Sequence, residues 1–239
     1  MFVSAIILAA GQGKRMNKGI NKQFLEVKDQ PVLVYTIEAF LKNCRVDEIV
    51  LVVNEKEITL IEDNIISTYF ATNRIQDKSK SIKIIPGGEE RYYSVHNGLK
   101  EINNDASIVL VHDGARPLVS QKEIDDIIDA LKIEHACILG VKAKNTYKVV
   151  DDDGYVTTTV PRENLYSILT PQGFRKDVII EAYKKGMNDP TGITDDGMMV
   201  EKHTQYRVKI IEGNYQNIKI TTPDDLVTME KIVEEQLFL

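Results

Sequence analysis

Long apolar runs are absent from this chain of 239 residues, and none approaches the roughly 18 consecutive apolar residues that a membrane-spanning helix needs. Cysteine is also scarce. Cys44 and Cys137 are far apart and form no C-x-x-C pair, which argues against a disulfide framework and against a zinc site. No basic residue precedes the apolar residues 1–10, so we interpret them as a first strand rather than a signal peptide. These absences predict a cytoplasmic protein without a membrane partner.

An excess of positive charge is missing as well. The 30 Lys and Arg residues are outnumbered by 36 Asp and Glu residues, which gives a formal net charge of −6. Because non-specific binding of nucleic acid needs a broad basic surface, we expect no nucleic-acid partner. The sequence also shows no Ser-His-Asp or Cys-His arrangement. We interpret its four histidines as structural or solvent-exposed: His96, His112, His135 and His203.

What the chain does contain is a regular alternation of short, apolar β-rich segments with amphipathic helical ones. Strands are predicted at 3–8, 48–53, 81–85, 107–112, 136–141, 206–211 and 217–221. Helices are predicted at 31–43, 55–69, 90–102, 120–133, 176–186 and 223–237. Such alternation is typical of an α/β fold in which helices cover both faces of a mostly parallel, twisted sheet. No linker or repeat indicates a second domain, so we expect one domain over residues 1–239.

Residues 142–164 interrupt this alternation. Two short β-rich runs, TYKVV and YVTTTV, are joined by the turn DDDG, which is a strong hairpin signal. A lone hairpin is marginally stable in water and needs a partner surface. It either folds onto its own sheet or forms an arm that reaches another subunit.

The loop LAAGQGKRM follows the first strand and combines glycine with positive charge. It is not a dinucleotide-binding fingerprint, because Met16 occupies the place of the third glycine. It is not a Walker loop either, since Gly11 and Gly13 are too close together. Its backbone amides can approach an anion, and its charge suits a triphosphate and a leaving pyrophosphate. The alternative is a solvated basic loop; its cations are Lys14, Arg15, Lys18 and Lys22.

Two further turns follow predicted strands at the carboxyl edge, where sheets of this kind bind ligands. In HDGARP, Asp113 and Arg116 can orient hydroxyls and phosphates, or form a salt bridge with each other. In PGGEERYYS, the two glycines let a ligand approach the backbone, and Arg91 and Ser94 open the next helix, where an anion or a base edge can be held. Lys219 could add one more cation or simply be exposed.

Taken together, these segments resemble the 2-C-methyl-D-erythritol 4-phosphate cytidylyltransferases of the non-mevalonate isoprenoid pathway. The motifs appear in the order of that family, from about residue 6 to about residue 226: LAAGQGKRM with KQFL, GGEERYYSV with GL, VHDGARP, PREN with LTPQGF, ITDD, and NIKITTPDDL. The resemblance implies a Rossmann-like nucleotidyltransferase fold with a protruding β-arm between subunits. It also implies transfer of CMP from CTP to methylerythritol phosphate, with release of pyrophosphate.

The resemblance further implies a role for each matching residue. The phosphate-binding, catalytic cations are Arg15, Lys22 and Lys219; the nucleotide-binding positions are Ala9, Ala10, Gly11, Gly13, Gly87, Gly88 and Ser94. The acceptor-binding positions are Asp113, Arg116 and Thr170, with Thr146 and Arg162 from the arm of the partner in a homodimer with shared sites. Two stretches depart from the family pattern, Asn145 where Asp is usual and TDDGMM where a TDDAS-like stretch is usual.

The chemistry of such a reaction explains the missing general base. The attacking phosphate is already ionised near neutral pH, because its second pKa is about 6. What remains is electrostatic and positional work on two anions, which Lys and Arg perform with a metal. We expect Mg²⁺ to be bound mainly through the CTP phosphates, and we assign it no protein ligand.

Three alternatives remain at this stage. A ribitol-5-phosphate cytidylyltransferase shares the first loop and the LTPQ-like and NIKIT elements, although HDGARP and RYYSVHNGL are closer to the erythritol family. A sugar-1-phosphate nucleotidyltransferase shares mainly the first loop. A silent nucleotide-binding module is expected to have lost some phosphate cations, yet Arg15, Lys22 and Lys219 are all present.

Overall fold

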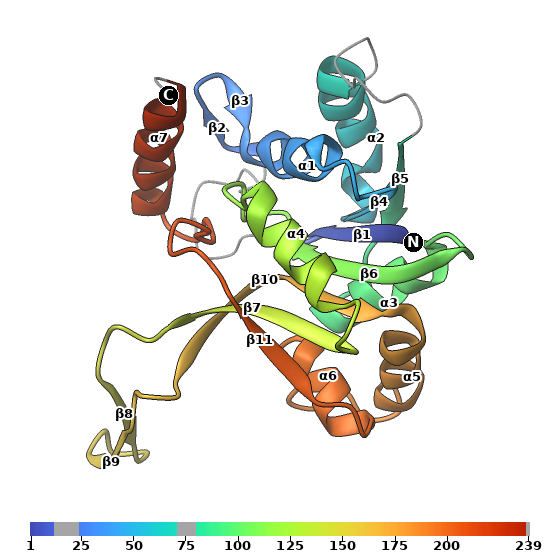
Figure 1. Cartoon of the computed structure of the whole chain (residues 1–239). Coiled ribbons are helices and arrows are strands. Elements are labelled where there is room, and N and C mark those ends of the chain that lie inside the picture. The colour runs from blue at the N-terminus through green and yellow to red at the C-terminus, as the bar shows by residue number, and fades with distance from the viewer. Residues whose placement is uncertain (12–23, 71–79, 238–239) are drawn as a thin grey trace.

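A twisted seven-stranded sheet forms the centre of the molecule (Figure 1). The computed structural model describes residues 1–11, 24–70 and 80–237. In spatial order the strands are β11 (Val208–Glu212), β7 (Ala136–Lys142), β10 (Tyr166–Arg175), β6 (Ala106–Asp113), β1 (Phe2–Ala9), β4 (Glu48–Val53) and β5 (Ser81–Pro86). Among the described strands of this sheet, only β10 runs antiparallel to its neighbours, so the prediction of a mostly parallel sheet is confirmed.

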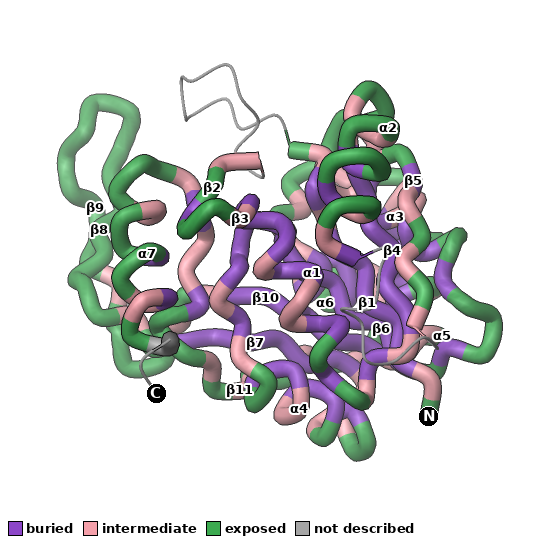
Figure 2. Tube along the Cα trace, turned by 90° about the horizontal axis from the view of Figure 1, so that it is seen from above, coloured by how far each residue is buried: buried purple, intermediate pink, exposed green. Residues whose placement is uncertain are grey.

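Helices cover both faces of this sheet because successive side chains of a strand point to opposite sides. In β1, Ile7 packs in one core cluster and Ile6 in the other. The first cluster includes side chains of α1 (Val32–Lys42), α4 (Gln121–Ala130) and the helical segment 55–70, which contains α2 (Ile58–Ile61). The second includes those of α3 (Arg91–Glu101), α5 (Lys176–Gly186) and α6 (Asp196–His203). Figure 2 shows the resulting buried centre.

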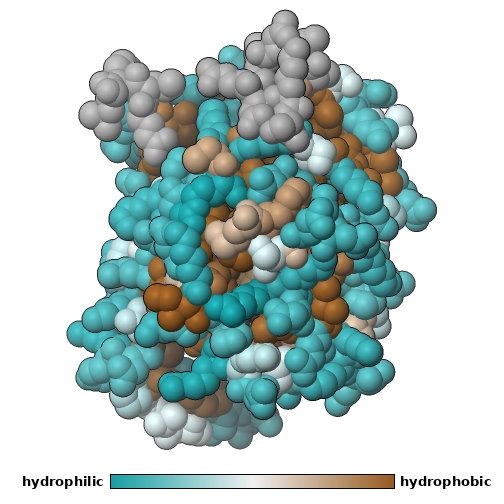
Figure 3. All heavy atoms as spheres, turned by 45° about the vertical axis from the view of Figure 1, so that its right-hand side comes forward, coloured by the Kyte–Doolittle hydropathy of each residue, from teal (hydrophilic) through white to brown (hydrophobic). Residues whose placement is uncertain are grey.

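The C-terminal helix α7 (Pro223–Leu237) lies apart from both clusters. Its Met229 and Val233 pack in a small third cluster with Val27 and Val32, next to the short hairpin of β2 (Glu26–Val27) and β3 (Gln30–Pro31). No helix within the described parts of the chain is both long and apolar enough to cross a bilayer. Figure 3 shows a mostly hydrophilic surface on the face that includes the right-hand side of Figure 1.

Strand β10 is the longest of the elements that the sequence analysis missed, which also include helix α6 and the short strands β2 and β3. It lies between β6 and β7 and pairs antiparallel with both. Pro171 and Gly173 interrupt its sequence, and both residues ordinarily argue against a central strand. The pairing with β7 shifts register between Ile168 and Gln172, a bulge of the kind that re-aims side chains. Thr170 lies in this bulge, and its hydroxyl oxygen accepts the Asp113 amide hydrogen at 3.1 Å.

The strand predicted at 217–221 is wrong. These residues pair with no strand among those described, and Asn217 instead closes a turn through its amide, which donates to the Asn214 carbonyl at 3.0 Å. A single backbone bond, from the Ile220 amide to the Ala115 carbonyl at 2.8 Å, holds the segment beside the end of β6. Ile218 and Ile220 both pack in the third core cluster, and this alternation of apolar residues explains the apparent strand pattern.

Residues 143–164 form a hairpin that stands away from the main sheet, whereas Lys142, the first residue of the predicted segment, still pairs within β7 (Figure 1). Its strands β8 (Tyr147–Val150) and β9 (Val156–Val160) pair only with each other in the described structure, and Gly154 takes a positive φ of 85° in the turn. The hairpin therefore does not fold onto its own sheet. Its apolar side chains are exposed: Tyr147, Val149, Val150, Tyr155 and Val156.

Candidate active site

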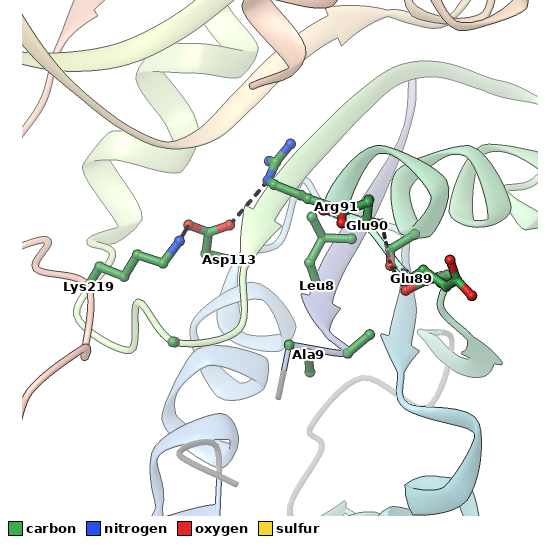
Figure 4. A pocket seen from close by; sticks show the side chains of 12 residues that line it. Leu8, Ala9, Glu89, Glu90, Arg91, Asp113 and Lys219 are labelled. Carbon is green, nitrogen blue, oxygen red and sulfur yellow. Dashed lines mark hydrogen bonds and ion pairs between the residues drawn. The ribbon is translucent and has the colours of Figure 1, made fainter. Parts of the chain in front are cut away.

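A cavity of about 190 Å³ lies at the carboxyl ends of β1 and β6 (Figure 4). The three segments predicted to meet at this edge contribute to its wall, as far as the structure describes them. Its lining residues include Ala9, Ala10, Gly11, Gly88, Ser94, Asp113 and Lys219. A more open hollow of about 620 Å³ adjoins it, shares Ala10, Gly11 and Gly88, and adds Gly87 and Asn54. The pair of cavities offers room for an elongated ligand.

The glycine turn after β5 brings bare backbone to this cavity. The Gly87 amide donates to the Val53 carbonyl at 2.7 Å, and the Gly88 amide donates to the Ser94 hydroxyl at 3.1 Å. A Cβ on Gly87 would lie 2.5 Å from the Ala10 Cβ and 2.8 Å from the Ser94 Oγ. The turn can therefore pass this close to β1 and α3 only with glycine at position 87.

Given the nucleotide-binding role that the family resemblance implies for Gly87, Gly87→Ala is expected to raise KM for the nucleotide severalfold, because the added methyl displaces Ala10 and Ser94, which line the cavity. KM for the other substrate should change much less. Steady-state kinetics with each substrate varied in turn measures both values. Gly197→Ala is the matched control, since a Cβ there meets no atom closer than 3.4 Å. Equal effects of Gly87→Ala on the two KM values would contradict this placement.

Asp113, at the end of β6, is surrounded by three cations. Its carboxylate lies 2.7 Å from the Lys219 Nζ, 3.6 Å from the Arg116 Nε and 3.7 Å from the Arg91 Nε. Burial alone would raise the pKa of the Asp113 carboxyl, but these cations outweigh burial and hold that pKa well below its ordinary value. Asp113 is therefore ionised at neutral pH, where it can accept hydrogen bonds from hydroxyl groups of a ligand.

Arg91 is held in place by a carboxylate on a distant segment. Its guanidinium forms a bidentate pair with Asp196, at 2.9 and 2.7 Å, and lines the cavity. Asp196 is fully buried, accepts the Tyr183 hydroxyl at 2.6 Å, and donates its amide to the Gln172 Oε1 at 3.0 Å. Burial opposes the charged guanidinium, but Asp196 outweighs it and raises the pKa of Arg91. Sequence reasoning missed this pair, because nothing in the separate motifs GGEERYYSV and ITDD connects them.

Arg116 and Thr170 lie next to Asp113 but outside the cavity wall. Arg116 donates from Nη1 to the Asn217 carbonyl at 2.8 Å, and burial lowers the pKa of its guanidinium. The Thr170 carbonyl accepts the Asn217 side-chain amide at 2.9 Å. The predicted pairing of Asp113 with Arg116 exists, although both residues also contact other groups.

His112 is fully buried directly before Asp113, which agrees with the structural of the two roles expected for it. Burial lowers the pKa of His112 to about 4, so the ring is neutral at neutral pH. In the unfolded chain the pKa is about 6.5, and the unfolded state therefore takes up a proton first as pH falls. The stability due to the neutral ring is complete above pH of about 6.5 and is lost progressively toward pH of about 4.

Between pH 7 and pH 5 we expect His112 to lower the free energy of unfolding by about 2 kcal/mol. Urea unfolding at the two pH values measures the change. His112→Phe has no titratable group at this position and should lack that share of the pH dependence. The same pH slope in both proteins would show that His112 does not titrate as its burial requires.

The remaining predicted residues lie elsewhere. Thr146 and Arg162 are exposed at the base of the hairpin, and Arg162 donates from Nη1 to the Lys144 carbonyl at 3.3 Å. Neither lines the cavity of its own chain. Gly13, Arg15 and Lys22 lie outside the described residues. Within the described parts of the chain, no group of three or more His, Cys, Asp or Glu side chains is placed to hold a metal ion.

Comparison with known proteins decides the family of this chain. The family model of the 2-C-methyl-D-erythritol 4-phosphate cytidylyltransferases matches residues 3–235. The chain belongs to this family.

Relatives that bear this family name cover almost the whole chain. The protein from Caldanaerobacter subterraneus subsp. tengcongensis is 42% identical over 96% of this chain and 98% of its own length. The one from Lachnoclostridium phytofermentans is 43% identical over 98% of this chain and 97% of its own length. Among solved structures, the 4-diphosphocytidyl-2C-methyl-D-erythritol synthase of Anaerococcus prevotii superimposes with a TM-score of 0.83 at 35% identity, covering 98% of both chains. The Rossmann-like nucleotidyltransferase fold expected from the family motifs is thus confirmed.

Proposed function

We propose that this cytidylyltransferase family member transfers CMP from CTP to 2-C-methyl-D-erythritol 4-phosphate. The products are 4-diphosphocytidyl-2-C-methyl-D-erythritol and pyrophosphate, in the synthesis of isoprenoid precursors. The observation that carries the proposal is the cluster of Lys219, Arg91 and Arg116 around Asp113, at the edge of a glycine-lined cavity. Glu89 and Glu90 also line the cavity, so individual cations such as Lys219, rather than a net positive edge, would bind the phosphates of the two substrates.

The glycine-lined part of the cavity would hold the nucleotide. Backbone groups at Ala10, Gly87 and Gly88 border the hollow and would read the edge of cytosine by hydrogen bonds, so a purine with a different edge would bind less well. Lys219, together with Arg15 and Lys22, would contact the triphosphate and stabilise the charge that develops as pyrophosphate leaves. The Ser94 hydroxyl fixes the turn through the Gly88 amide.

The acceptor would lie on the Asp113 side. Its phosphate is ionised at neutral pH and needs no general base, so the residues here only orient it and limit repulsion between two anions. The ionised Asp113 would accept hydrogen bonds from polyol hydroxyls, while the positive charge of Arg116 would favour the acceptor phosphate nearby. Thr170, bonded to the Asp113 amide, belongs to the same side.

We further propose that the reaction uses Mg²⁺ held mainly by the CTP phosphates. The cavity fits such an ion, because Asp113, the buried carboxylate that lines it, is already paired with Lys219 and would leave coordination mainly to the substrate. Mg²⁺ ordinarily takes one or two carboxylates at most beside phosphate oxygens and water. When bound, it would neutralise phosphate charge, and the Lys and Arg side chains would stabilise what remains.

The active unit would be a homodimer with shared sites in the cytoplasm. The exposed apolar hairpin supports a partner subunit, because a hairpin of this size needs another surface and twofold dimers are the commonest closed assembly. Thr146 and Arg162 would then reach the acceptor of the partner's site. The two cysteines are unpaired, which is compatible with a reducing compartment.

Pyrophosphate release tests the proposal directly. The purified protein is incubated with Mg²⁺, CTP and one acceptor at a time: methylerythritol phosphate, ribitol 5-phosphate or a sugar 1-phosphate. Release should be fast only with the first acceptor and should fall steeply when ATP or GTP replaces CTP. Equal or better use of ribitol 5-phosphate would overturn the assigned acceptor, and no release with any acceptor would overturn the transfer reaction itself.

A further inference from the structure

The buried ring of His112 connects Asp113, Arg116 and Thr170 of the acceptor side through hydrogen bonds. This ring is fully buried, with its centroid 4.9 Å from that of Phe40. The Nδ1 lies 3.0 Å from the Thr170 hydroxyl, and the Nε2 lies 3.1 Å from the Arg116 carbonyl oxygen. The hydroxyl of Thr170 in turn accepts the amide hydrogen of Asp113 at 3.1 Å. One imidazole thus links the end of β6, the bend after it and the bulge of β10.

These partners fix the tautomer of the ring. A carbonyl oxygen can only accept, so the Nε2 of His112 must bear the hydrogen that it donates to Arg116. The neutral ring then has a lone pair on Nδ1, and the Thr170 hydroxyl must donate to it. The hydrogen bonds therefore run in one direction, from the Asp113 amide to Thr170 and from Thr170 to His112, while His112 donates to the Arg116 carbonyl.

We propose that His112 is a positioning residue for the acceptor, which orients Asp113, Arg116 and Thr170 through this directed hydrogen-bond chain. The inference rests on the proposed function, in which these three residues contact the polyol phosphate. His112 itself is buried behind them and touches neither substrate.

A purely structural role does not account for this arrangement. An apolar side chain beside Phe40 would fill the same space without the cost of burying two ring nitrogens. That cost is offset here only because both nitrogens are hydrogen-bonded, and both bonds reach segments of the acceptor side. The glycine turn that would hold the nucleotide has no bond to the ring among those described, so the effect of His112 should be confined to one substrate.

Kinetics of His112→Phe test this selectivity. KM for methylerythritol phosphate should rise about tenfold, whereas KM for CTP should change by less than about twofold. His112→Asn keeps an acceptor near Nδ1 and His112→Gln keeps a donor near Nε2, so each should restore part of the loss. His135→Phe is the matched control. The His135 ring stacks on that of Tyr206, with 4.5 Å between the ring centroids, and His135 directly precedes the first residue of β7. Parallel changes in both KM values for His112→Phe would overturn the proposal.

The tautomer provides a second test, which needs only the folded protein. Nitrogen-15 NMR of histidine-labelled protein at neutral pH should show a protonated Nε2 and an unprotonated Nδ1 for His112. Thr170→Val should shift the Nδ1 signal, because it removes the donor, and should leave His135 unchanged. A protonated Nδ1, or no shift in Thr170→Val, would refute the directed chain. If the wild-type protein forms no product, the proposed function fails, whereas the tautomer result stands by itself.

Discussion

Lys219→Ala is expected to lower kcat by about 10²–10³-fold, the usual cost of removing one preorganised electrostatic contact to a transition state. Lys219 lies 2.7 Å from Asp113 and lines the cavity, so its charge is fixed in place before substrates bind. The α-phosphorus becomes crowded with negative charge as pyrophosphate leaves, and a cation fixed there stabilises that state more than the ground state. Stopped assays of pyrophosphate release at saturating substrates measure kcat, and thermal unfolding checks that the fold is intact.

Lys176→Ala is the matched control for this variant. Its Nζ donates to the carbonyls of Asn103 and Asn104, before the amino end of β6 and therefore away from the cavity. This control should retain near-normal turnover. Loss of Lys219 should also raise the pKa of Asp113, because Lys219 contributes most among the cations that lower it. Near-normal kcat in Lys219→Ala would remove Lys219 from the catalytic residues.

Mixing Arg162→Ala with Lys219→Ala is expected to restore activity that each variant lacks alone when the polyol phosphate is well below the raised KM of Arg162→Ala. In a homodimer with shared sites, each site combines the body of one protomer with the arm of the other. A mixed dimer then places both substitutions in one site and leaves the second site intact. Activity per mixed dimer should return toward half of the wild-type value. Differently tagged subunits, purified as mixed dimers, allow this measurement.

Arg162→Ala alone should mainly raise KM for the polyol phosphate, since a guanidinium on the arm would bind the acceptor phosphate rather than CTP. Lys148→Ala is the control on the same arm, because its Nζ donates to the Thr159 hydroxyl within the hairpin. Mixed dimers without activity, or a fully active monomer, would refute the shared site.

The parts of the fold that follow from local pattern were predictable. The strand at 48–53 is correct to the residue because EIVLVV is buried along its whole length in a sheet covered on both faces. Helix 176–186 is likewise correct, since it presents a regular buried stripe that includes Val178, Ile179 and Ala182. Both elements are determined by their own residues.

The parts that depend on distant partners were not predictable. β10 is a strand despite Pro171 and Gly173, because β6 and β7 bind both of its edges. The pairing of Arg91 with Asp196 joins residues 105 positions apart. The orientation of the His112 ring depends on its hydrogen bond with Thr170, which is 58 positions away. Motif resemblance predicted residues of which several line one cavity, whereas the side chains that hold them in place became visible only in three dimensions.

The place of β10 also governs the order in which the chain can fold. Residues up to Asp113 already supply four neighbouring strands, β5, β4, β1 and β6, so this half of the sheet can assemble early during synthesis. One edge of β6 stays unpaired until residues 166–175 have been made. Strand β7 is made before them and likewise lacks its partner on the edge that β10 will occupy. Unpaired strand edges are sites of wrong association between chains. A chain made only as far as the hairpin therefore leaves one edge of β6 and both edges of β7 unpaired. The arrival of β10 closes the two edges that face each other, and β11 later closes the remaining edge of β7.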